Sequence, residues 1–311
     1  MSLAHVFERL RAGRPLVVAA DSSSSLRARG VELDVPGALG KLLRERPDDV
    51  LAHHRVEVSC RSDILAALTG DTMPRALAEV GMEHRAAQLT SRAVELAIEA
   101  AEESPKPIAV AGVLGSDMVS PVAATRLHEE LEEHSMRLAA AGCELLIARG
   151  QGSRLNLMAA VVAASRTELP IWAVIERSSD AVAGSDLFRA LHAAGACAVL
   201  FEVPSVALGL SELARSRDLL AETDLAVGVL LAASESAVTG FPDSSLSPDV
   251  WADHALDLDI AGARVIGGGA GTTEAHLSAL ARALGSLHPS LPVHRSDTEL
   301  DPEFKRPPTG F

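Results

Sequence analysis

Several residue types are scarce or missing in this chain of 311 residues. Tyrosine is absent, which excludes a phenol as a general acid. Lysine occurs only at Lys41, Lys106 and Lys305. None of these lysines ends a predicted strand, so Schiff-base aldolase chemistry is not expected. No apolar run approaches the ~18 residues of a membrane span, and residues 1–13 lack the apolar core of a signal peptide. We therefore expect a cytoplasmic protein.

Cysteine and basic surface are scarce too. Cys60, Cys143 and Cys197 lie far apart, so no Cys-x-x-Cys motif exists, and we expect small buried thiols in a reducing compartment. The formal charge is −14 and the pI about 5.2. Without a basic patch such a chain is repelled by nucleic acid and by anionic lipid. We expect a small-molecule metabolite as partner, and a homo-oligomer or a protein partner remains open.

What the chain does contain is a repeated alternation of strand and helix. Short apolar runs of the kind buried on both faces of a parallel sheet fall at residues 16–20, 64–68, 108–114, 145–148, 171–175, 198–203, 225–231 and 264–267. Amphipathic helical spacing covers residues 77–103, 124–141, 155–167, 186–194, 206–221, 249–261 and 274–284. Gly142, Gly195 and Gly262 each stand between a helix and a strand, as C-cap glycines do.

Eight such β-α units predict an α/β fold, a single-domain (β/α)8 TIM barrel. The alternative is an open doubly wound sheet, but the turn after the first strand lacks the glycine fingerprint usual there. We assign residues 1–287 to the barrel. Residues 288–311, rich in proline and charge, are expected to form an extended C-terminal tail.

Polar residues gather where the strands end, which is where such barrels carry their sites. The expected substrate-binding residues here are Thr69, Arg149 and Glu176, and the expected catalytic acids or bases are Asp21 and Glu202. Arg177 ends the same strand as Glu176, and Asp117, Ser234 and Glu235 lie at the ends of other strands. The acids could instead hold Mg²⁺, or could be surface charges paired with arginine.

The last strand runs into a loop with four glycines in residues 267–271. Glycine lets backbone approach a ligand closely, and a loop entering a helix N-terminus favours anions. The loop is therefore expected to bind substrate through Gly268, Gly269, Ala270, Gly271 and Thr272. The alternative is that these glycines only permit a tight turn. Thr272 or Thr273 is expected to cap the next helix, with Glu274 in its first turn.

The histidines form no known metal motif. His53, His54, His84, His128, His134 and His192 fall in helical segments, where we expect surface or hydrogen-bonded positions. No metal site and no cofactor is expected.

Five segments resemble the homocysteine S-methyltransferase family. Asp21 with Leu26, Arg29 and Gly30 is similar to its Asp-Gly-…-Leu-…-Arg-Gly opening, and residues 63–69 lie where it has Asp-Ile-Ile-Thr-Thr-Asn-Thr. Residues 111–115 and 141–146 resemble Ala-Gly-Ser-Leu-Gly and Ala-Gly-Val-Asp-Leu-Leu. Residues 262–273 resemble Gly-Ala-…-Ile-Gly-Gly-Cys-Cys-Gly-Thr-Thr. The resemblance implies the same (β/α)8 barrel.

The resemblance also implies a zinc ion on three cysteine thiolates, which holds homocysteine for methyl transfer. Those positions are Val203, Gly269 and Ala270 here, so the zinc-binding cysteines are missing. The family's acid at the end of strand four is Arg149, which favours a carboxylate or phosphate over an ammonium group.

Three functions remain open. The first is a divergent, zinc-independent methyltransferase-like transferase that binds or transforms a small anionic metabolite. The second is a non-catalytic pseudoenzyme that binds a metabolite or a protein partner. The third, which we rank last, is the family's activity with another metal held by carboxylates.

Overall fold

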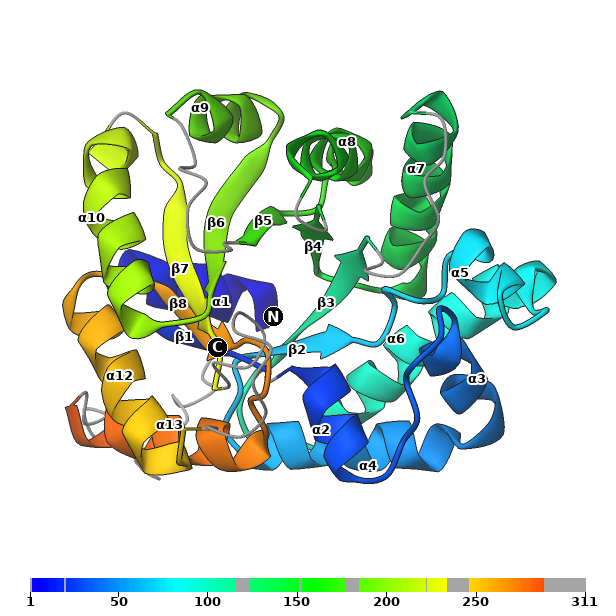
Figure 1. Ribbon diagram of the computed structural model, residues 1–311, viewed down its shortest axis with the longest axis horizontal. Helices are drawn as coiled ribbons and strands as arrows, with labels where there is room; N and C mark the ends of the chain where they lie inside the picture. The colour runs from blue at the N-terminus through cyan, green and yellow to red at the C-terminus, as the bar shows by residue number, and fades with distance from the viewer. Residues whose placement is uncertain are drawn as a thin grey trace, which may run out of the picture.

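The computed structural model describes residues 2–19, 21–115, 124–150, 153–176, 185–221, 223–233 and 246–287. Eight parallel strands form a closed barrel in the order β1 to β8 (Figure 1). Their bounds are β1 Leu16–Val18, β2 Ile64–Ala67, β3 Ala109–Leu114, β4 Leu145–Arg149, β5 Ile171–Glu176, β6 Ala196–Val203, β7 Ala226–Leu231 and β8 Val265–Gly268. The predicted single-domain (β/α)8 TIM barrel is confirmed.

Helices surround the barrel on its outside (Figure 1). They are α1 Ser2–Arg11, α2 Ser22–Ala28, α3 Ala38–Glu45, α4 Pro47–Ser59, α5 Pro74–Ala78, α6 Ala86–Glu102, α7 Ala124–Ala141, α8 Arg154–Ala164, α9 Ser185–Ala193, α10 Val206–Ala221, α12 Pro248–Ile260 and α13 Glu274–Leu287, with 3-10 turns η1 Glu83–Arg85 and η2 Ser165–Thr167. Among the described residues, no helix combines the length and apolar character needed to span a membrane.

The strands are buried on both faces because the barrel interior and the helix layer each take alternate side chains. Val18, Ile147, Trp172 and Leu200 belong to one buried cluster of strand residues. A larger cluster joins the other strand side chains to the surrounding helices. The apolar runs of the sequence therefore predicted the strands well.

Two parts of the helix layer differ from the expectation. The segment 77–103 was expected to be one helix, but it forms α5, η1 and α6. The break includes Gly81, whose φ of +69° lies in the left-handed region and ends the helical path. In addition, α2, α3 and α4 all lie between β1 and β2, where no full helix was delimited from the sequence. The expected C-cap glycines are confirmed, since Gly142, Gly195 and Gly262 all have positive φ.

The end of the barrel where the strands begin is held by a buried carboxylate. Asp63, which directly precedes β2, accepts a hydrogen bond from the Val17 N–H at 2.8 Å. Its other oxygen forms ion pairs with Arg9 of α1 and, at 2.9 Å, with Lys106. The charged contacts at this end thus join α1, β1, β2 and the segment before β3.

Candidate functional site

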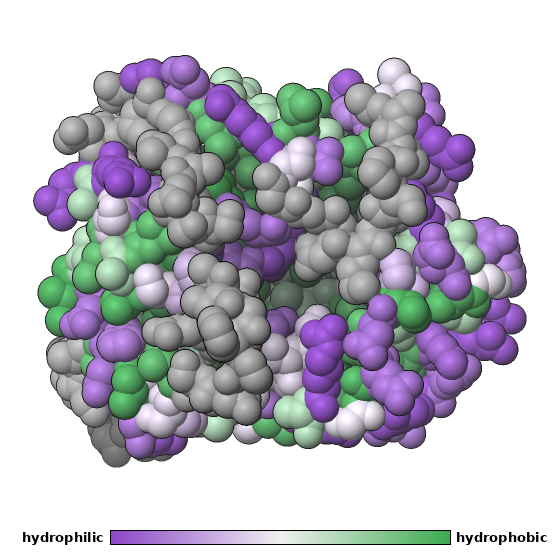
Figure 2. All heavy atoms as spheres, in the orientation of Figure 1, coloured by the Kyte–Doolittle hydropathy of each residue, from purple (hydrophilic) through white to green (hydrophobic). Residues whose placement is uncertain are grey.

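The ends of the strands surround a hollow that carries charged side chains. Figure 2 shows the face seen in Figure 1 hollowed near its centre, where hydrophilic side chains gather. In a barrel of parallel strands this end is built by the loops that follow the strands. The described residues at the ends of β4, β5 and β6 are Arg149, Glu176 and Glu202–Val203.

Arg149 contacts both of the predicted glutamates. Its Nη2 donates a hydrogen bond to Glu202 Oε2, and its Nε lies 3.7 Å from Glu176 Oε1. Strand register explains the meeting, because Glu176 pairs with Glu202 across β5 and β6. Arg149 pairs with Val174 on β5, and side chains two residues apart on a strand share a face. All three predicted residues are therefore brought together.

This triad is neither buried nor freely solvated. The side chains of Arg149, Glu176 and Glu202 are 23%, 27% and 22% exposed, respectively. A guanidinium between two carboxylates can bind an anionic group, and the carboxylates can accept protons or bind an ammonium group. The cluster can thus recognise a small molecule that carries charges of both signs.

Asp21, by contrast, caps a helix. Its Oδ1 accepts a hydrogen bond from the Ser23 N–H at 3.1 Å, and its Oδ2 accepts one from Ser24 Oγ at 2.5 Å. Its own N–H donates to Thr272 Oγ1 at 3.0 Å. Both carboxylate oxygens are therefore occupied in this conformation, and a catalytic role for Asp21 stays a prediction.

The glycine loop uses several of its own amides. The Gly269 N–H donates to Leu231 O at 2.9 Å, the Gly271 N–H to Ser24 Oγ at 3.0 Å, and the Thr272 N–H to Gly269 O at 3.1 Å. These amides are not open to an anion as the loop stands. The close backbone approach expected of the glycines is made within the protein, and ligand binding by Gly268, Gly269, Ala270, Gly271 and Thr272 stays a prediction.

Of the two candidate caps for α13, Thr273 occupies the position before the helix. Its N–H and hydroxyl both contact His276 Nδ1, at 3.1 and 3.0 Å, while Thr272 is buried and its hydroxyl donates to Gly269 O at 2.7 Å. Glu274 begins α13, as predicted.

Thr69 joins two strand ends. It is buried, and its Oγ1 accepts a hydrogen bond from the Val113 N–H at 2.8 Å and lies 3.0 Å from Val113 O. His134 of α7 lies behind it, with Nε2 3.2 Å from Thr69 O. Burial lowers the pKa of His134 to about 4, so the imidazole is neutral and Nε2–H donates to that carbonyl. Substrate binding by Thr69 stays a prediction.

Other expectations fall outside the described residues. These are the strand-end residues Asp117, Arg177, Ser234 and Glu235, and the tail of residues 288–311.

Sequence reasoning missed a buried group on the outer helix α4. His53 and His54 were expected at surface or hydrogen-bonded positions, and His54 is hydrogen-bonded, with its Nδ1 3.0 Å from Glu57 Oε2. Both side chains are buried. Among the described residues, His53 Nδ1, His53 Nε2 and His54 Nε2 have no hydrogen-bond partner. The signal was present as the spacing His53-His54-x-x-Glu57, which places three polar side chains along one side of a helix.

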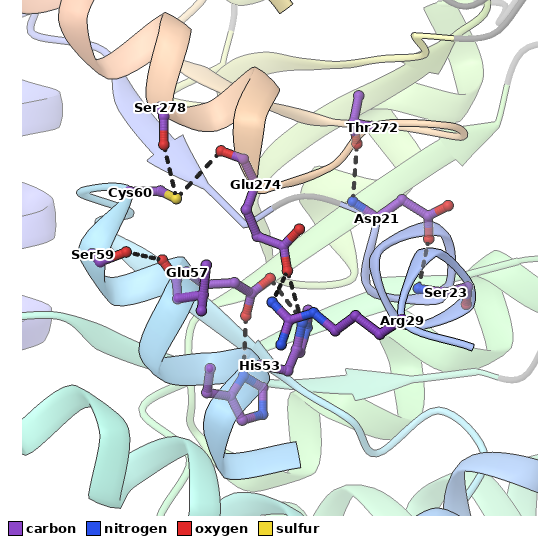
Figure 3. A network of polar contacts seen from close by, with 12 residues as sticks. Asp21, Ser23, Arg29, His53, Glu57, Ser59, Cys60, Thr272, Glu274 and Ser278 are labelled. Carbon is purple, nitrogen blue, oxygen red and sulfur yellow. Dashed lines mark hydrogen bonds and ion pairs between the residues drawn. The ribbon is translucent and has the colours of Figure 1, made fainter. Parts of the chain in front are cut away.

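The group on α4 reaches the end of the glycine loop through Glu274. Figure 3 shows the carboxylate of Glu274, at the start of α13, pointing toward Arg29 and His53. Arg29 forms an ion pair with Glu274, and His53 Nδ1 lies 3.4 Å from Glu274 Oε1. Burial acts to lower the pKa of His53, but the Glu57 and Glu274 carboxylates outweigh it and the net shift is upward. Contact with His53 in turn lowers the pKa of Glu274 to about 2.

The three cysteines lie away from the triad. Cys60 caps the end of α4, Cys143 precedes β4, and Cys197 is the second residue of β6. All three are free thiols, and burial raises the pKa of each, that of Cys143 to about 12. Buried thiols of this kind are inert.

The fold is a (β/α)8 barrel with charged side chains at its strand ends, and comparison identifies the family. The sequence profile described as homocysteine S-methyltransferase matches residues 19–284. The chain therefore belongs to the homocysteine S-methyltransferase family, as its sequence motifs predicted.

Solved structures agree at the level of the fold. The metallated form of the homocysteine methyltransferase MmuM from Escherichia coli is 20% identical, with a TM-score of 0.72, over 86% of this chain and 96% of that one. The oxidised form of MmuM is 21% identical over the same shares, also with a TM-score of 0.72. The carboxyl transferase domain of Rhizobium etli pyruvate carboxylase is 13% identical, with a TM-score of 0.52, over 88% of this chain and 47% of that one.

Proposed function

We propose that this chain is a divergent enzyme of the family that binds a small anionic metabolite at the barrel mouth and transfers a group, most simply methyl, without a thiolate-bound zinc ion. The observation that carries the proposal is the placement of Arg149 between Glu176 and Glu202. This cluster combines groups that can donate or accept a proton with a group that can bind an anion.

Each member of the triad has a role. Arg149 would bind the carboxylate or phosphate of the substrate, since a guanidinium matches planar oxyanions with two parallel hydrogen bonds. Glu202 would take a proton from the attacking group of the substrate, which then displaces the leaving group of the donor. Glu176 would bind a positive group on the substrate. Asp21 and Thr272 would position the surrounding loop.

The zinc that the resemblance implies does not fit the residues at these positions. Val203, Gly269 and Ala270 carry no side-chain donor atom, and the chain's three cysteines all lie elsewhere. A Cβ atom at Gly269 would come within 3.0 Å of the Ala232 nitrogen and 3.1 Å of the Leu231 carbonyl carbon. The local packing therefore favours glycine over a cysteine ligand. The proposed transfer does not use zinc.

A second candidate is a metabolite-binding protein without turnover. The observation that favours it is how many polar groups of the mouth are engaged within the protein: the Asp21 carboxylate caps α2, and the Gly269 and Gly271 amides hold the loop. Under this alternative the triad recognises the metabolite but no proton is moved.

The test combines binding with turnover. Amino acids, including homocysteine, and small carboxylates and phosphates would be screened by calorimetry against the purified protein, after its metal content has been measured. Methyl transfer would then be assayed with S-methylmethionine or S-adenosylmethionine as donor. Arg149→Met is expected to weaken binding of the identified ligand by at least about tenfold, the loss of one charge-assisted contact. Glu202→Gln is expected to lower kcat with little change in KM.

The matched control is Arg126→Met, because Arg126 is an exposed arginine of α7 that also forms an ion pair with a glutamate, Glu130. The proposed site would be wrong if both arginine variants weakened ligand binding equally, or if neither variant weakened it. Tight binding that depends on Arg149 without any turnover would select the binding protein over the enzyme.

A further inference from the structure

The buried group on α4 is the most unusual feature outside the barrel mouth. His53, His54 and Glu57 are all fully buried, yet His53 Nε2, His54 Nε2 and Glu57 Oε1 have no hydrogen-bond partner among the described residues. A buried polar atom without a partner costs free energy, and natural proteins have few of them. Two of these atoms, His53 Nε2 and Glu57 Oε1, lie side by side at 3.4 Å, which indicates a missing common partner.

The spacing of the atoms identifies what that partner is. One donor atom from each of the three side chains lies within 4.8 Å of the others. His53 Nε2 is 3.4 Å from Glu57 Oε1, and His54 Nδ1 is 3.0 Å from Glu57 Oε2. Ligand atoms bound tetrahedrally at 2.0–2.1 Å from a zinc ion are about 3.3 Å apart. The His53–Glu57 separation matches such an edge better than it matches a short hydrogen bond.

The two imidazole rings have a compatible arrangement. Their centroids are 5.3 Å apart and the ring planes are tilted by 45°, so the rings are not stacked. Neighbouring residues of a helix rarely point at one position, but Glu57 lies one turn further along and faces both rings. The three side chains converge from one helix.

A second carboxylate supports the histidine. His53 faces Glu57 with Nε2 and Glu274 with Nδ1, each at 3.4 Å. Histidines that bind a metal through one nitrogen usually donate the other N–H to a carboxylate, which fixes the ring orientation. Arg29 holds Glu274 in place from the solvent side. Glu274 is 15% exposed and Arg29 34%, so of the charged groups in the cluster these two lie nearest to solvent.

We propose that His53, His54 and Glu57 bind a divalent transition-metal ion of the zinc type, with Glu274 as the carboxylate that orients His53. Two imidazoles and one carboxylate suit zinc and its first-row neighbours better than Mg²⁺ or Ca²⁺, which prefer oxygen ligands. Glu57 and Glu274 carry two negative charges and Arg29 carries one positive charge, so the cluster has a negative excess when its imidazoles are neutral. The ion would tie α4 to the start of α13, directly after the glycine loop.

The site is independent of the proposed function, and its role is structural. No described residue of the strand ends takes part in it, and its three ligands lie on a helix outside the barrel. Bound metal stabilises a folded chain by the free energy of binding, because the unfolded chain does not present the three ligands together.

The test uses the full chain, stripped of metal with a chelator. Zn²⁺ titrated by calorimetry is expected to bind with one site per chain and to raise Tm, and Co²⁺ in its place is expected to show the visible absorption of a tetrahedral ion. Glu57→Gln and His54→Gln should each weaken Zn²⁺ binding by more than about 100-fold, because even changes to orienting residues cost 10–100-fold. Glu274→Gln should weaken Zn²⁺ binding by about 10–100-fold.

The double variant His128→Gln with Glu132→Gln is the matched control. It removes a histidine–glutamate pair at the same four-residue spacing, but on the exposed surface of α7. This variant should bind Zn²⁺ like the parent chain. Absence of stoichiometric Zn²⁺ binding to the parent chain would overturn the proposal, whatever the variants do. So would binding that survives both Glu57→Gln and His54→Gln, or an octahedral Co²⁺ spectrum.

Discussion

Glu176 and Glu202 are register partners on β5 and β6, and the Arg149 guanidinium contacts both of their carboxylates. Two like charges on neighbouring strands repel each other, and the arginine from β4 compensates for that repulsion. The three residues form one unit, because the removal of the arginine leaves two partly buried acids facing each other.

This coupling can be measured. We expect a double-mutant cycle on Arg149→Met and Glu202→Gln to give a coupling free energy of about 1 kcal/mol, the upper range for partly exposed pairs. The measurement is urea unfolding of the four proteins at low salt, where screening is weakest. A coupling free energy indistinguishable from zero would contradict the contact.

The buried histidine behind Thr69 makes stability depend on pH. The pKa of His134 is lowered by burial to about 4, against 6.5 for the unfolded chain. Between these values the unfolded chain binds the proton and the folded chain does not, so the free energy of unfolding falls as the pH drops from 6.5 toward 4. We expect this one residue to account for a loss of about 3 kcal/mol over that window.

The measurement is urea unfolding at pH 7, 6, 5 and 4. His134→Gln keeps a donor for Thr69 O but cannot take up the proton, and the slope of stability against pH is expected to be smaller in this variant. The exposed His128→Gln serves as control and should follow the parent chain. Parallel curves for the parent and His134→Gln would show that His134 does not titrate in this window.

Two glycines give opposite predictions for the same substitution. A Cβ atom at Gly228 of β7 would lie 2.5 Å from the Val265 carbonyl oxygen, which is fixed in β8. Gly228→Ala is therefore expected to lower the free energy of unfolding by about 1–3 kcal/mol through overpacking. Gly285 lies in α13 with nothing within 4 Å of its Cβ position, and Gly285→Ala should stabilise by up to about 1 kcal/mol. Thermal unfolding of the two variants measures whether each substitution raises or lowers the stability of the folded chain. A loss of stability in Gly285→Ala, or none in Gly228→Ala, would contradict this packing.

Sequence patterns predicted the barrel because each strand is buried on both faces and so appears as an unbroken apolar run. The ends of β4, β5 and β6 followed from the same runs, which is why Arg149, Glu176 and Glu202 could be expected at one end of the barrel. Their mutual contact could not be read from the sequence, because it depends on register. The pairing of β5 with β6 shifts by one residue, since Ile171 pairs with Ala196 but Trp172 with Ala198.

Other features could not be predicted from local patterns. Asp21 ends an apolar strand and was expected to act as a catalyst, which stays a prediction. That its carboxylate also caps α2 follows from the serines after it, which begin a helix that needs an N-cap. His53 and His54 were expected at surface or hydrogen-bonded positions because histidine commonly takes them. What buries them is the packing of α4 against α6, β2 and α13, a contact between distant segments that no local pattern reveals.

The barrel is closed by the two ends of the described chain: β1 pairs with β8 at Leu16 and Val265, and Asp21 donates to Thr272. A ribosome delivers the N-terminal strand first and the C-terminal strand last. Throughout synthesis, therefore, one edge of β1 stays without its neighbour, and β7 gains an open edge as soon as it emerges. Open strand edges are templates for pairing with other chains. β8 pairs with both of these edges, so the nascent chain is open to self-association until β8 has been made and closes the barrel.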